Sequence, residues 1–398
     1  MTGQFPSRRV IHITSSISRN GGGIPPVIWS LVRQTLKTGG DSIVAGLKDA
    51  HFEMDSRDAG VSVVGGRVVG PRALGFSPEL RRALTFEVRP TDAIHVHGLW
   101  MYPGVLAASL SRLKGCKRVV SPHGMLEPWA LKHSSSKKKL AGWCFERQNL
   151  RTADCLHALC NQEAQNIRNY GLRNPVAVIP NGIDLAENAV GSKGAAVLQE
   201  FPQLKERQIL LFLSRVHPKK GLPDLLQAWA KTRPHEKNWV LLVVGPNELG
   251  HEQELRKLAD DLQISQYVVF TGPAYGEKKQ QLLSAANGFV LPSHSEGFSV
   301  AVLEAAAARL PIILTKECNF PELAAAGAAI EVPAGQVGAT EGLVRFLALN
   351  ETDRRQMGSK GYELVKRSYT WPAVAGQMAL VYDWLEDKCP RPDCILTI

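Results

Sequence analysis

Short apolar runs alternate with helical patterns along almost the whole chain, and the alternation starts again near the middle. Strand followed by helix, repeated many times, predicts an α/β fold with parallel, doubly wound sheets. Strands are expected at residues 9–14, 42–45, 61–64, 93–97, 118–121, 155–160 and 176–179, and after the restart at 209–213, 240–244, 268–270, 288–291 and 311–314. Helices are expected between them, and the chain should end in helices at 340–349, 353–368 and 372–386.

Length and composition agree with two separate sheets. A chain of 398 residues that is 44% apolar can bury two cores. We expect a first domain at residues 1–185, an irregular connection at 186–207, a second domain at 208–370 and a loose tail at 388–398.

The sequence also bears on location. It contains no run of about 18 apolar residues, and residues 1–9 lack the apolar core of a signal peptide, so a cytoplasmic location is expected. Seven scattered cysteines without metal-binding spacing favour reduced thiols over a disulfide framework: Cys116, Cys144, Cys155, Cys160, Cys318, Cys389 and Cys394.

Positive charge is concentrated in the first half. Residues 1–180 hold 24 Lys and Arg against 12 Asp and Glu, whereas the remainder holds 23 against 25. This asymmetry favours an anionic partner for the first half, such as a phospholipid surface, a lipid-linked phosphate or a nucleic acid. Basic and aromatic residues between 129 and 152 suit either an anionic membrane surface or a solvated helix with its aromatic side chains in the core.

The most informative motif is Ser293-His294-Ser295-Glu296-Gly297-Phe298-Ser299, which links the strand at 288–291 to a helix at 300–310. Such a turn lies at the carboxyl edge of a parallel sheet, where free helix N–H groups can bind phosphate. Glu304 follows Glu296 by eight residues, roughly 12 Å along a helix, so the two could hold opposite ends of a sugar nucleotide. The spacing alone is equally consistent with no ligand: Glu296 would then be an acid at the start of a helix, favoured by the helix dipole, and Glu304 a solvated helix residue.

A second loop carries two cations. Arg215 and Lys220 lie between the strand at 209–213 and the helix at 223–231, where diphosphate oxygens would accept hydrogen bonds from them. A basic loop is usually just solvent-exposed, but this one belongs to the same sheet edge as Glu296. We therefore interpret it as a second wall of one anion site.

In the first half, glycine and histidine mark the corresponding edge. Gly21, Gly22 and Gly23 follow the first strand without forming a GxGxxG fingerprint, and we interpret them as a ligand loop. His97, Trp100, Tyr102 and His123 come just after strand ends, where such sheets bind ligands. A lone histidine there is more often structural. His123, between Pro122 and Gly124, is nevertheless expected to face the ligand crevice, whereas His97 fits either role.

Taken together, these motifs resemble the large retaining glycosyltransferase family 4, which has the GT-B fold. The matching segments occur in the family's order and span nearly the whole chain: Gly21-Gly22, Pro122-His123-Gly124, Pro180-Asn181-Gly182-Ile183-Asp184, Ser214-Arg215-x4-Lys220-Gly221, Glu296-x7-Glu304 and Ser368-Tyr369-Thr370-Trp371. The resemblance implies two Rossmann-like domains facing across a cleft. It also implies that the chain crosses back near Trp371, so that a helix at 371–387 packs on the first domain.

The resemblance further implies roles for individual residues. Arg215 and Lys220 would bind the donor diphosphate, helped by backbone amides around Gly22, Gly23, Gly297, Phe298 and Ser299. Glu304 would accept hydrogen bonds from the ribose hydroxyls. Glu296 would contact the transferred sugar with His123 beside it, as the catalytic pair. His97, Trp100 and Tyr102 are candidate acceptor-binding residues. No metal or other cofactor is expected, because the sequence has no Asp-x-Asp motif and no clustered ligand set.

The expected activity is retaining transfer of a hexose from a nucleotide diphosphate sugar to a glycan or lipid-linked acceptor in cell-surface polysaccharide synthesis. The basic first domain makes a peripheral position on the inner face of the membrane plausible. Two alternatives stay open. A GT-B relative such as a nucleotide-sugar epimerase would consume donor without an acceptor. A non-catalytic binding protein for lipid or nucleic acid would leave Glu296 and Glu304 without a task, and the acidic-leaning second half argues against nucleic acid as a partner.

Overall fold

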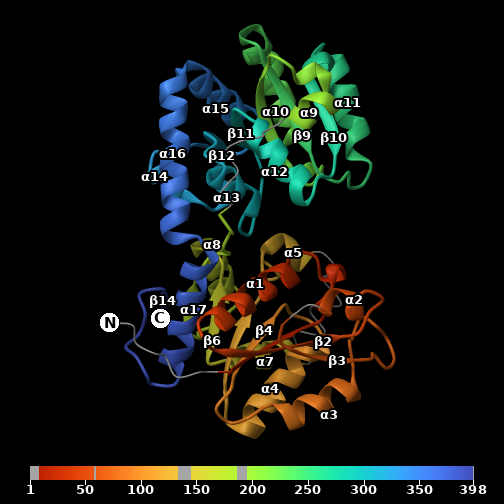
Figure 1. Cartoon of the computed structure of the whole chain (residues 1–398), viewed down its shortest axis with the longest axis vertical. Coiled ribbons are helices and arrows are strands. Elements are labelled where there is room, and N and C mark those ends of the chain that lie inside the picture. Colours follow the sequence, from red (N-terminus) through yellow and green to blue (C-terminus); the bar gives the residue numbers. More distant parts are fainter. Residues whose placement is uncertain (1–8, 58–59, 133–144, 186–194, 398) are drawn as a thin grey trace. The chain divides into compact units, whose positions relative to one another are not determined.

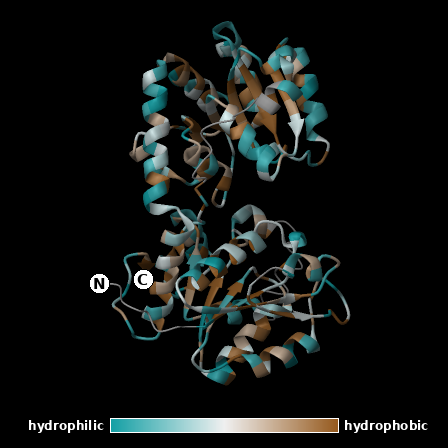
Figure 2. Cartoon of the chain, viewed as in Figure 1, coloured by the Kyte–Doolittle hydropathy of each residue, from teal (hydrophilic) through white to brown (hydrophobic). Residues whose placement is uncertain are grey.

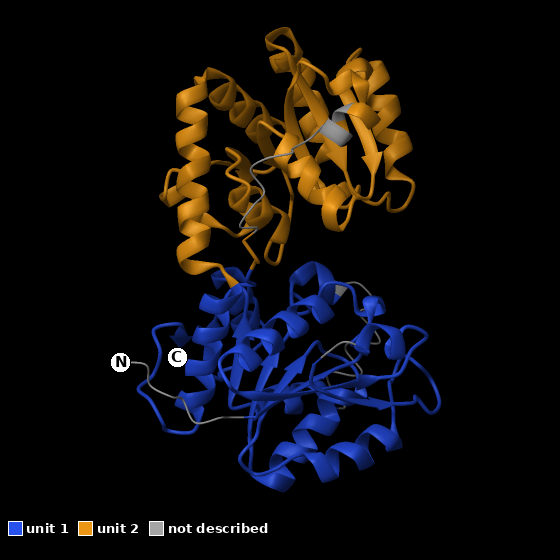
Figure 3. Ribbon diagram, in the orientation of Figure 1, with its two compact units in different colours: residues 1–182, 371–398 blue, residues 183–370 orange. Residues whose placement is uncertain are grey.

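The chain folds into two compact units, described here from a computed structural model of residues 9–57, 60–132, 145–185 and 195–397. Unit 1 comprises residues 1–182 and 371–398, and unit 2 comprises residues 183–370 (Figure 3). The chain therefore leaves unit 1 after Gly182 and returns to it at Trp371. Within the described residues, no helix is both long enough and apolar enough to span a bilayer.

Unit 1 is built on an eight-stranded sheet with the order β14-β7-β6-β5-β4-β1-β2-β3. All neighbours pair in parallel except β14, which is antiparallel to β7. The chain order runs outward from β1 to β3, then continues from β4 to β7 on the other side of β1. The direction of winding therefore changes between β1 and β4. Its strands are β1 Arg9–Thr14, β2 Asp41–Leu47, β3 Ser62–Gly66, β4 Ala93–His97, β5 Lys117–Ser121, β6 Cys155–Ala158, β7 Val176–Val178 and β14 Ile395–Leu396.

Helices cover both faces of this sheet (Figure 1). On one face, α3, α4, α7 and α8 bury apolar side chains such as Leu84, Leu106 and Ile167 against the strands. On the other face, α1 and α17 pack against Val10, Ala93 and neighbouring strand residues. The helices are α1 Ile24–Lys37, α2 Phe52–Ser56, α3 Pro78–Glu87, α4 Tyr102–Lys114, α5 Pro128–Lys132, α7 Arg147–Arg151, α8 Asn161–Asn169 and α17 Trp371–Leu385.

Unit 2 repeats the plan with six parallel strands in the order β10-β9-β8-β11-β12-β13. The winding direction changes between β8 and β11. The strands are β8 Gln208–Leu213, β9 Trp239–Val244, β10 Val268–Gly272, β11 Gly288–Leu291, β12 Ile312–Thr315 and β13 Ala329–Val332. The helices are α9 Ala195–Glu200, α10 Leu222–Thr232, α11 His251–Asp261, α12 Gly276–Ala285, α13 Val300–Ala307, α14 Pro321–Ala325, α15 Gln336–Ala348 and α16 Glu351–Ser368.

Hydropathy follows this layering. Most strands of the two sheets are brown in Figure 2, whereas the helices carry a mixture of teal, white and brown. Central strands of unit 2, such as Gln208–Leu213 and Trp239–Val244, are nearly continuous apolar runs, which is why the sequence predicted them well. The expected parallel α/β architecture is confirmed in both units.

The structure corrects two sequence-based expectations and adds a strand that the sequence did not predict. Part of the proposed connection is ordered, because α9 and the 3-10 turn Pro202–Leu204 pack Val197 and Leu204 into the core of unit 2. The tail is not loose: β14 pairs with β7, and Ile395 is buried. The strand β13 was missed, because Ala329–Val332 is only four residues long and a glutamate interrupts its apolar run. The helix expected at 129–152 shows helical ends, α5 and α7, while residues 133–144 lie outside the described part.

The buried tail strand gives a test of the fold. Ile395 is 5% exposed and packs into the cluster formed by α1, α17 and the sheet, whereas its neighbour Leu396 is 43% exposed. Ile395→Ala should lower the free energy of unfolding of unit 1 by about 2 kcal/mol, and Leu396→Ala by about 0.5 kcal/mol or less. Urea denaturation of both variants measures this. Equal, small effects would mean that the tail is not docked.

Candidate functional site

A buried ion pair lies at the point where the winding of unit 2 changes direction. Lys220 is in the 3-10 turn Pro218–Lys220 after β8, and Glu296 is in the turn after β11, the strand next to β8. Lys220 Nζ donates to Glu296 Oε1 at 2.6 Å, and the side chains are 7% and 12% exposed. Ser293 Oγ donates to the same oxygen at 2.7 Å. Desolvating two charges is costly, so a pair this buried is weak evidence for a role in stability.

The two strand-end turns are locked together by their backbones. Gly221 has φ +71°, and a Cβ there would lie 2.0 Å from the carbonyl oxygen of Pro292. Only glycine permits both this backbone conformation and this close approach. The N–H of His294 also donates to the carbonyl oxygen of Lys219 at 2.8 Å. The sequence therefore fixes the position of Lys220 relative to the Glu296 turn.

A third loop, following β12, supports the Glu296 turn from the other side. The N–H of Glu296 donates to the carbonyl oxygen of Glu317, and the side-chain amide of Asn319 donates to the carbonyl oxygen of Glu296 at 2.6 Å. Thr315 Oγ1 donates to the carbonyl oxygen of Ser293. Sequence reasoning missed Thr315 and Asn319. The only signal for them was their place at the end of a predicted strand, which is too common to be specific.

The turn leads into α13, whose start can receive an anion. Ser299 is the N-cap residue, and its side chain makes no capping hydrogen bond. N–H groups of the first helical turn lack intrahelical partners by geometry, and the helix dipole favours negative charge there. Phe298 packs near Phe320 and Tyr369, which fixes the entry of the chain into the helix. The predicted phosphate-binding residues Gly297, Phe298 and Ser299 thus directly follow Glu296, in the turn that leads from the Lys220–Glu296 pair into α13.

Glu304 and Arg215 each have a partner that the sequence did not reveal. Glu304, on α13, accepts a charge-assisted hydrogen bond from Lys279 of α12, so it is not a solvated helix residue. One guanidinium nitrogen of Arg215, Nη1, donates to both carboxylate oxygens of Glu248 at 3.0 Å, and 55% of the arginine side chain is exposed. Within the described part of the chain, Arg215 makes no hydrogen bond or ion pair with the Glu296 turn. The structure thus unites Lys220 with Glu296, whereas Arg215, on the same loop after β8, pairs with Glu248 in the loop after β9.

In unit 1, polar side chains line the corresponding edge of the sheet. Because side chains alternate between faces along a strand, His12, His95, His97 and His157 all project to the face covered by α1 and α17. Strand register brings them together, since His12 pairs with His95 across β1 and β4. The four rings are at most 4% exposed. The carboxyl ends of adjacent strands therefore carry a buried histidine layer rather than an apolar core.

One hydrogen-bonded chain in this layer has a fixed direction. It runs from Tyr382 OH through His95, Ser121 Oγ and His157 to the carbonyl oxygen of Ile179, with distances of 2.6 to 2.7 Å. A carbonyl can only accept, so His157 donates from Nε2 and accepts at Nδ1. Ser121 then donates to His157, His95 donates from Nε2 to Ser121, and Tyr382 donates to His95. These directions hold for neutral rings, and burial lowers the pKa of His157 to about 4 and that of His95 well below 6.5.

The predicted residue His123 joins the layer from the turn after β5. Its Nε2 lies 3.1 Å from His97 Nδ1, and its backbone has φ +52°. The buried carboxyl of Glu163 holds this turn, accepting from the N–H of Gly124 at 2.6 Å and from the N–H of Leu159 at 2.8 Å. Burial raises the pKa of Glu163 to about 6. Sequence reasoning missed Glu163, which lies on α8 without a motif.

The other predicted residues of unit 1 take less direct positions. His97 is 2% exposed, so it lies in the interior rather than on an acceptor surface. Trp100 and Tyr102 pack against the apolar core under α3 and α4, and the N–H of Trp100 donates to buried Glu146. Gly22 has φ +64°, and a Cβ at Gly22 or Gly23 would meet no atom within 4 Å, so this loop leaves open space.

Three histidines of the buried layer in unit 1 lie close enough together to be considered as metal ligands. Ring nitrogens of His12, His95 and His97 lie within 4.8 Å of one another, close enough to hold a metal ion. Both nitrogens of His95 already make hydrogen bonds, however, and its ring is stacked on that of His97, which favours the hydrogen-bonded arrangement. The expectation of no metal stays a prediction.

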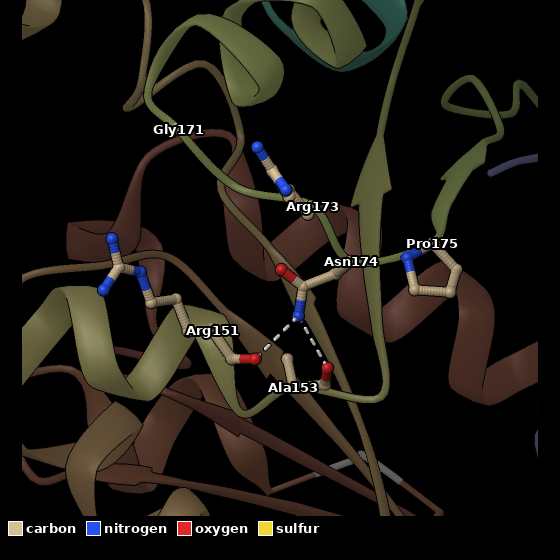
Figure 4. A pocket seen from close by; sticks show the side chains of 6 residues that line it. All are labelled: Arg151, Ala153, Gly171, Arg173, Asn174 and Pro175. Carbon is tan, nitrogen blue, oxygen red and sulfur yellow. Dashed lines mark hydrogen bonds between the residues drawn. The ribbon is translucent and has the colours of Figure 1, made fainter. Parts of the chain in front are cut away.

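A pocket of about 670 Å³ lies between Arg151, Arg173 and Asn174 (Figure 4). These residues precede β6 and β7, so the pocket is at the opposite ends of the strands from the candidate site.

The histidine layer predicts acid lability of unit 1. Burial lowers the pKa of His12 and His157 to about 4 and of His123 to about 3, and it lowers those of His95 and His97 well below 6.5. The unfolded chain therefore binds protons that the folded unit excludes. The free energy of unfolding of unit 1 is therefore highest above pH 6.5, the ordinary pKa of histidine, and it falls as the pH falls toward 4. At pH 5.5 each buried ring lowers it by up to about 1.4 kcal/mol.

Hydrogen exchange at pH 7.5 and 5.5, corrected for intrinsic rates, measures this for each unit. Unit 1 should lose several kcal/mol of protection and unit 2 much less, although Glu163 opposes the trend weakly because its pKa is raised. His12→Phe should reduce the slope of the unfolding free energy of unit 1 against pH by the equivalent of about one proton. Equal losses in the two units would contradict the buried, neutral layer.

Comparisons with known proteins agree with this geometry. The model of the glycosyl transferase 4-like domain matches residues 22–182, and that of glycosyl transferases group 1 matches residues 197–364, one in each unit. A GDP-mannose:cellobiosyl-diphosphopolyprenol alpha-mannosyltransferase of Xanthomonas oryzae is 26% identical over 93% of this chain and 95% of its own length. A GDP-mannose-dependent alpha-(1-6)-phosphatidylinositol monomannoside mannosyltransferase of Mycobacterium tuberculosis is 24% identical over 93% and 97%.

Solved structures show the same fold. The Anabaena protein HepE in complex with UDP superimposes with a TM-score of 0.74 at 18% identity, over 95% of this chain and all of that one. Sucrose-phosphate synthase from Thermosynechococcus elongatus gives 0.74 at 19% identity, over 96% of this chain and all of the synthase. With both halves matched and both sheets doubly wound, the chain belongs to the group 1 (family 4) glycosyltransferases and has their GT-B fold.

Proposed function

We propose that this glycosyltransferase transfers a hexose, with retention of anomeric configuration, from a nucleotide diphosphate sugar to a lipid-linked glycan. The observation that carries the proposal is the buried Lys220–Glu296 pair at the winding switch of unit 2, next to the start of α13. In open α/β sheets, ligands bind at this switch point. A cation, a carboxylate and a helix N-terminus are the groups needed to bind a diphosphate and a sugar.

The chemistry of the pair suits the departure of a nucleoside diphosphate. Negative charge grows on the leaving diphosphate as the bond to the sugar breaks, and a fixed cation stabilises that charge more in the transition state than in the ground state. Lys220 and the first amides of α13 would supply this stabilisation without a metal ion. Glu296 would release Lys220 to the phosphate and accept hydrogen bonds from sugar hydroxyls.

Glu304 and Arg215 would serve the nucleotide end of the donor. A carboxylate suits the vicinal diol of a ribose, and Lys279 keeps Glu304 charged and oriented. Arg215, half-exposed and held by Glu248, can turn to a phosphate without leaving an interior position. Full-length relatives that use GDP-mannose make this the first donor to test, with UDP-glucose as its comparator.

The acceptor side of the proposal is supported by charge and by the relatives. The surplus of Lys and Arg lies in residues 1–180, and an acceptor carried on a lipid diphosphate is anionic. The Xanthomonas relative is named for a diphosphopolyprenol acceptor and the mycobacterial one for a phosphatidylinositol mannoside. We therefore propose a role in cell-surface glycan synthesis, with the first unit binding the acceptor at an anionic membrane surface.

Donor binding should depend on Lys220. Removing its hydrogen bonds to a phosphate should weaken binding of GDP-mannose or UDP-glucose, whichever the protein binds, by about tenfold to a hundredfold. Because Lys220→Met alone leaves the buried Glu296 unpaired, the double variant Lys220→Met/Glu296→Gln is the better-folded test. Lys231→Met, at the exposed end of α10, is the matched control. Isothermal titration calorimetry measures the affinities, and unchanged binding in the double variant would contradict the proposed site.

Transfer should depend on Glu296. Glu296→Gln keeps the shape of the side chain but removes its charge, so kcat for transfer to a polyprenyl-diphosphate glycan should fall about a hundredfold or more. Affinity for the free nucleoside diphosphate should change little, because the sugar is absent. Chromatography of the products separates the alternatives. Donor conversion that needs no acceptor would favour an epimerase, and binding without any donor consumption would favour a non-catalytic protein.

A further inference from the structure

A second hydrogen-bonded chain of histidines leads from the interior of unit 1 to His123. His12 Nδ1 lies 3.0 Å from His97 Nε2, and His97 Nδ1 lies 3.1 Å from His123 Nε2. His12 and His97 are buried, whereas His123 is partly exposed in its turn. Among the described residues, the outer nitrogen of His123, Nδ1, has no hydrogen-bond partner, so it is the end of the chain that can meet a ligand.

Neutral imidazoles allow this chain only two proton arrangements. Each ring carries one N–H, so all three N–H groups must point the same way. In the inward arrangement, His123 donates from Nε2 and His12 is left with an N–H at Nε2. In the outward arrangement, His12 donates from Nδ1, His97 donates from Nδ1, and His123 carries its proton on Nδ1. The choice determines whether His123 offers a donor or a lone pair.

The surroundings of His12 Nε2, the inner end of the hydrogen-bonded chain, favour one of the two proton arrangements. His12 Nε2 is buried and has no hydrogen-bond partner among the described residues. A buried N–H without an acceptor is rarer in proteins than a buried acceptor without a donor. His12 Nε2 is therefore better left unprotonated, and all three N–H groups point outward. The His95 and His97 rings stack with centroids 4.1 Å apart, which fixes the plane of the His97 ring in either arrangement.

We propose that His12 and His97 are positioning residues that hold His123 as its Nδ1–H tautomer, ready to donate a hydrogen bond to the transferred sugar. The identity of the ligand rests on the function proposed above, whereas the tautomer rests on unit 1 alone. A neutral donor has a chemical advantage here. The sugar gains positive charge at its anomeric carbon during transfer, and an imidazolium beside it would oppose that charge.

Burial supports the neutral state on which this assignment depends. It lowers the pKa of His12 to about 4 and of His123 to about 3, with His157 adding a smaller repulsion at His123. Burial and the neighbouring histidines also lower the pKa of His97 well below 6.5. At neutral pH each ring of the chain therefore carries a single proton, as the two arrangements require.

Nitrogen NMR of the full chain labelled with ¹⁵N-histidine tests the tautomer directly and needs no sugar ligand. Protonated and unprotonated ring nitrogens have well-separated shifts, and His123→Gln identifies the signals of His123 among those of the 11 histidines. At pH 7.5 we expect His123 to be protonated on Nδ1 and unprotonated on Nε2. A proton on Nε2 of His123, or on both nitrogens, would overturn the proposal whether or not the protein is an active transferase.

Two variants of His97 test its positioning role. His97→Asn retains an amide N–H where His97 Nδ1 lies, so His123 should keep its Nδ1–H signal. His97→Leu removes the donor, and the signal should shift toward the Nε2–H form. With the donor that the protein uses, kcat should fall at least tenfold in His97→Leu and recover in His97→Asn, while the donor KM changes less than threefold.

The controls make each outcome decisive. Melting temperatures of both variants show whether unit 1 is folded, and if His97→Leu does not fold, the unmodified protein and His97→Asn still report the tautomer. An unchanged His123 signal in folded His97→Leu would overturn the role of His97. A shifted signal without any transferase activity in the unmodified protein would instead count against the proposed function, leaving the tautomer assignment in place.

Discussion

The candidate site depends on a single buried ion pair, Lys220 with Glu296, held where two strand-end turns meet. Desolvating two charges is unfavourable, and the pair persists because Ser293 adds a hydrogen bond and the surrounding backbones are locked. Gly221 allows one turn to touch the carbonyl of Pro292, and Asn319 fixes the other. A cation that is already desolvated and oriented needs little reorganisation to bind phosphate, which is the condition for strong electrostatic stabilisation.

Both units place polar groups where the winding of a parallel sheet changes direction, but they use different chemistry. Unit 2 gathers charge there: Lys220, Glu296 and the dipole of α13. Unit 1 gathers neutral hydrogen-bonding rings, the layer of His12, His95, His97 and His157 that ends at His123. Charge suits a diphosphate that becomes more negative during the reaction, and neutral donors suit a sugar that becomes more positive.

Sequence reasoning located most strands because strands buried on both faces are continuous apolar runs. Sequence reasoning failed for segments that have no long apolar run and are ordered by tertiary contacts instead. The strand β14 is only two residues long and is stabilised by pairing with β7, and α9 is ordered by Val197 in the core of unit 2. At the site, Lys220 and Glu296 were found from their place at strand ends. Glu163, Asn319 and Lys279 were not, because each acts from a separate segment without a motif.

The sequence by itself determined the two doubly wound sheets, the family and the turn that carries Glu296, because apolar periodicity and glycine-containing turns are local properties of the chain. Only the tertiary structure decided which side chains are partners. Strand order placed Lys220 beside Glu296, 76 residues apart, and strand register placed His12 beside His97, 85 residues apart. The alternation of side chains across a strand says that His12, His95 and His97 share a face, but only the neighbours on that face determine where their protons lie.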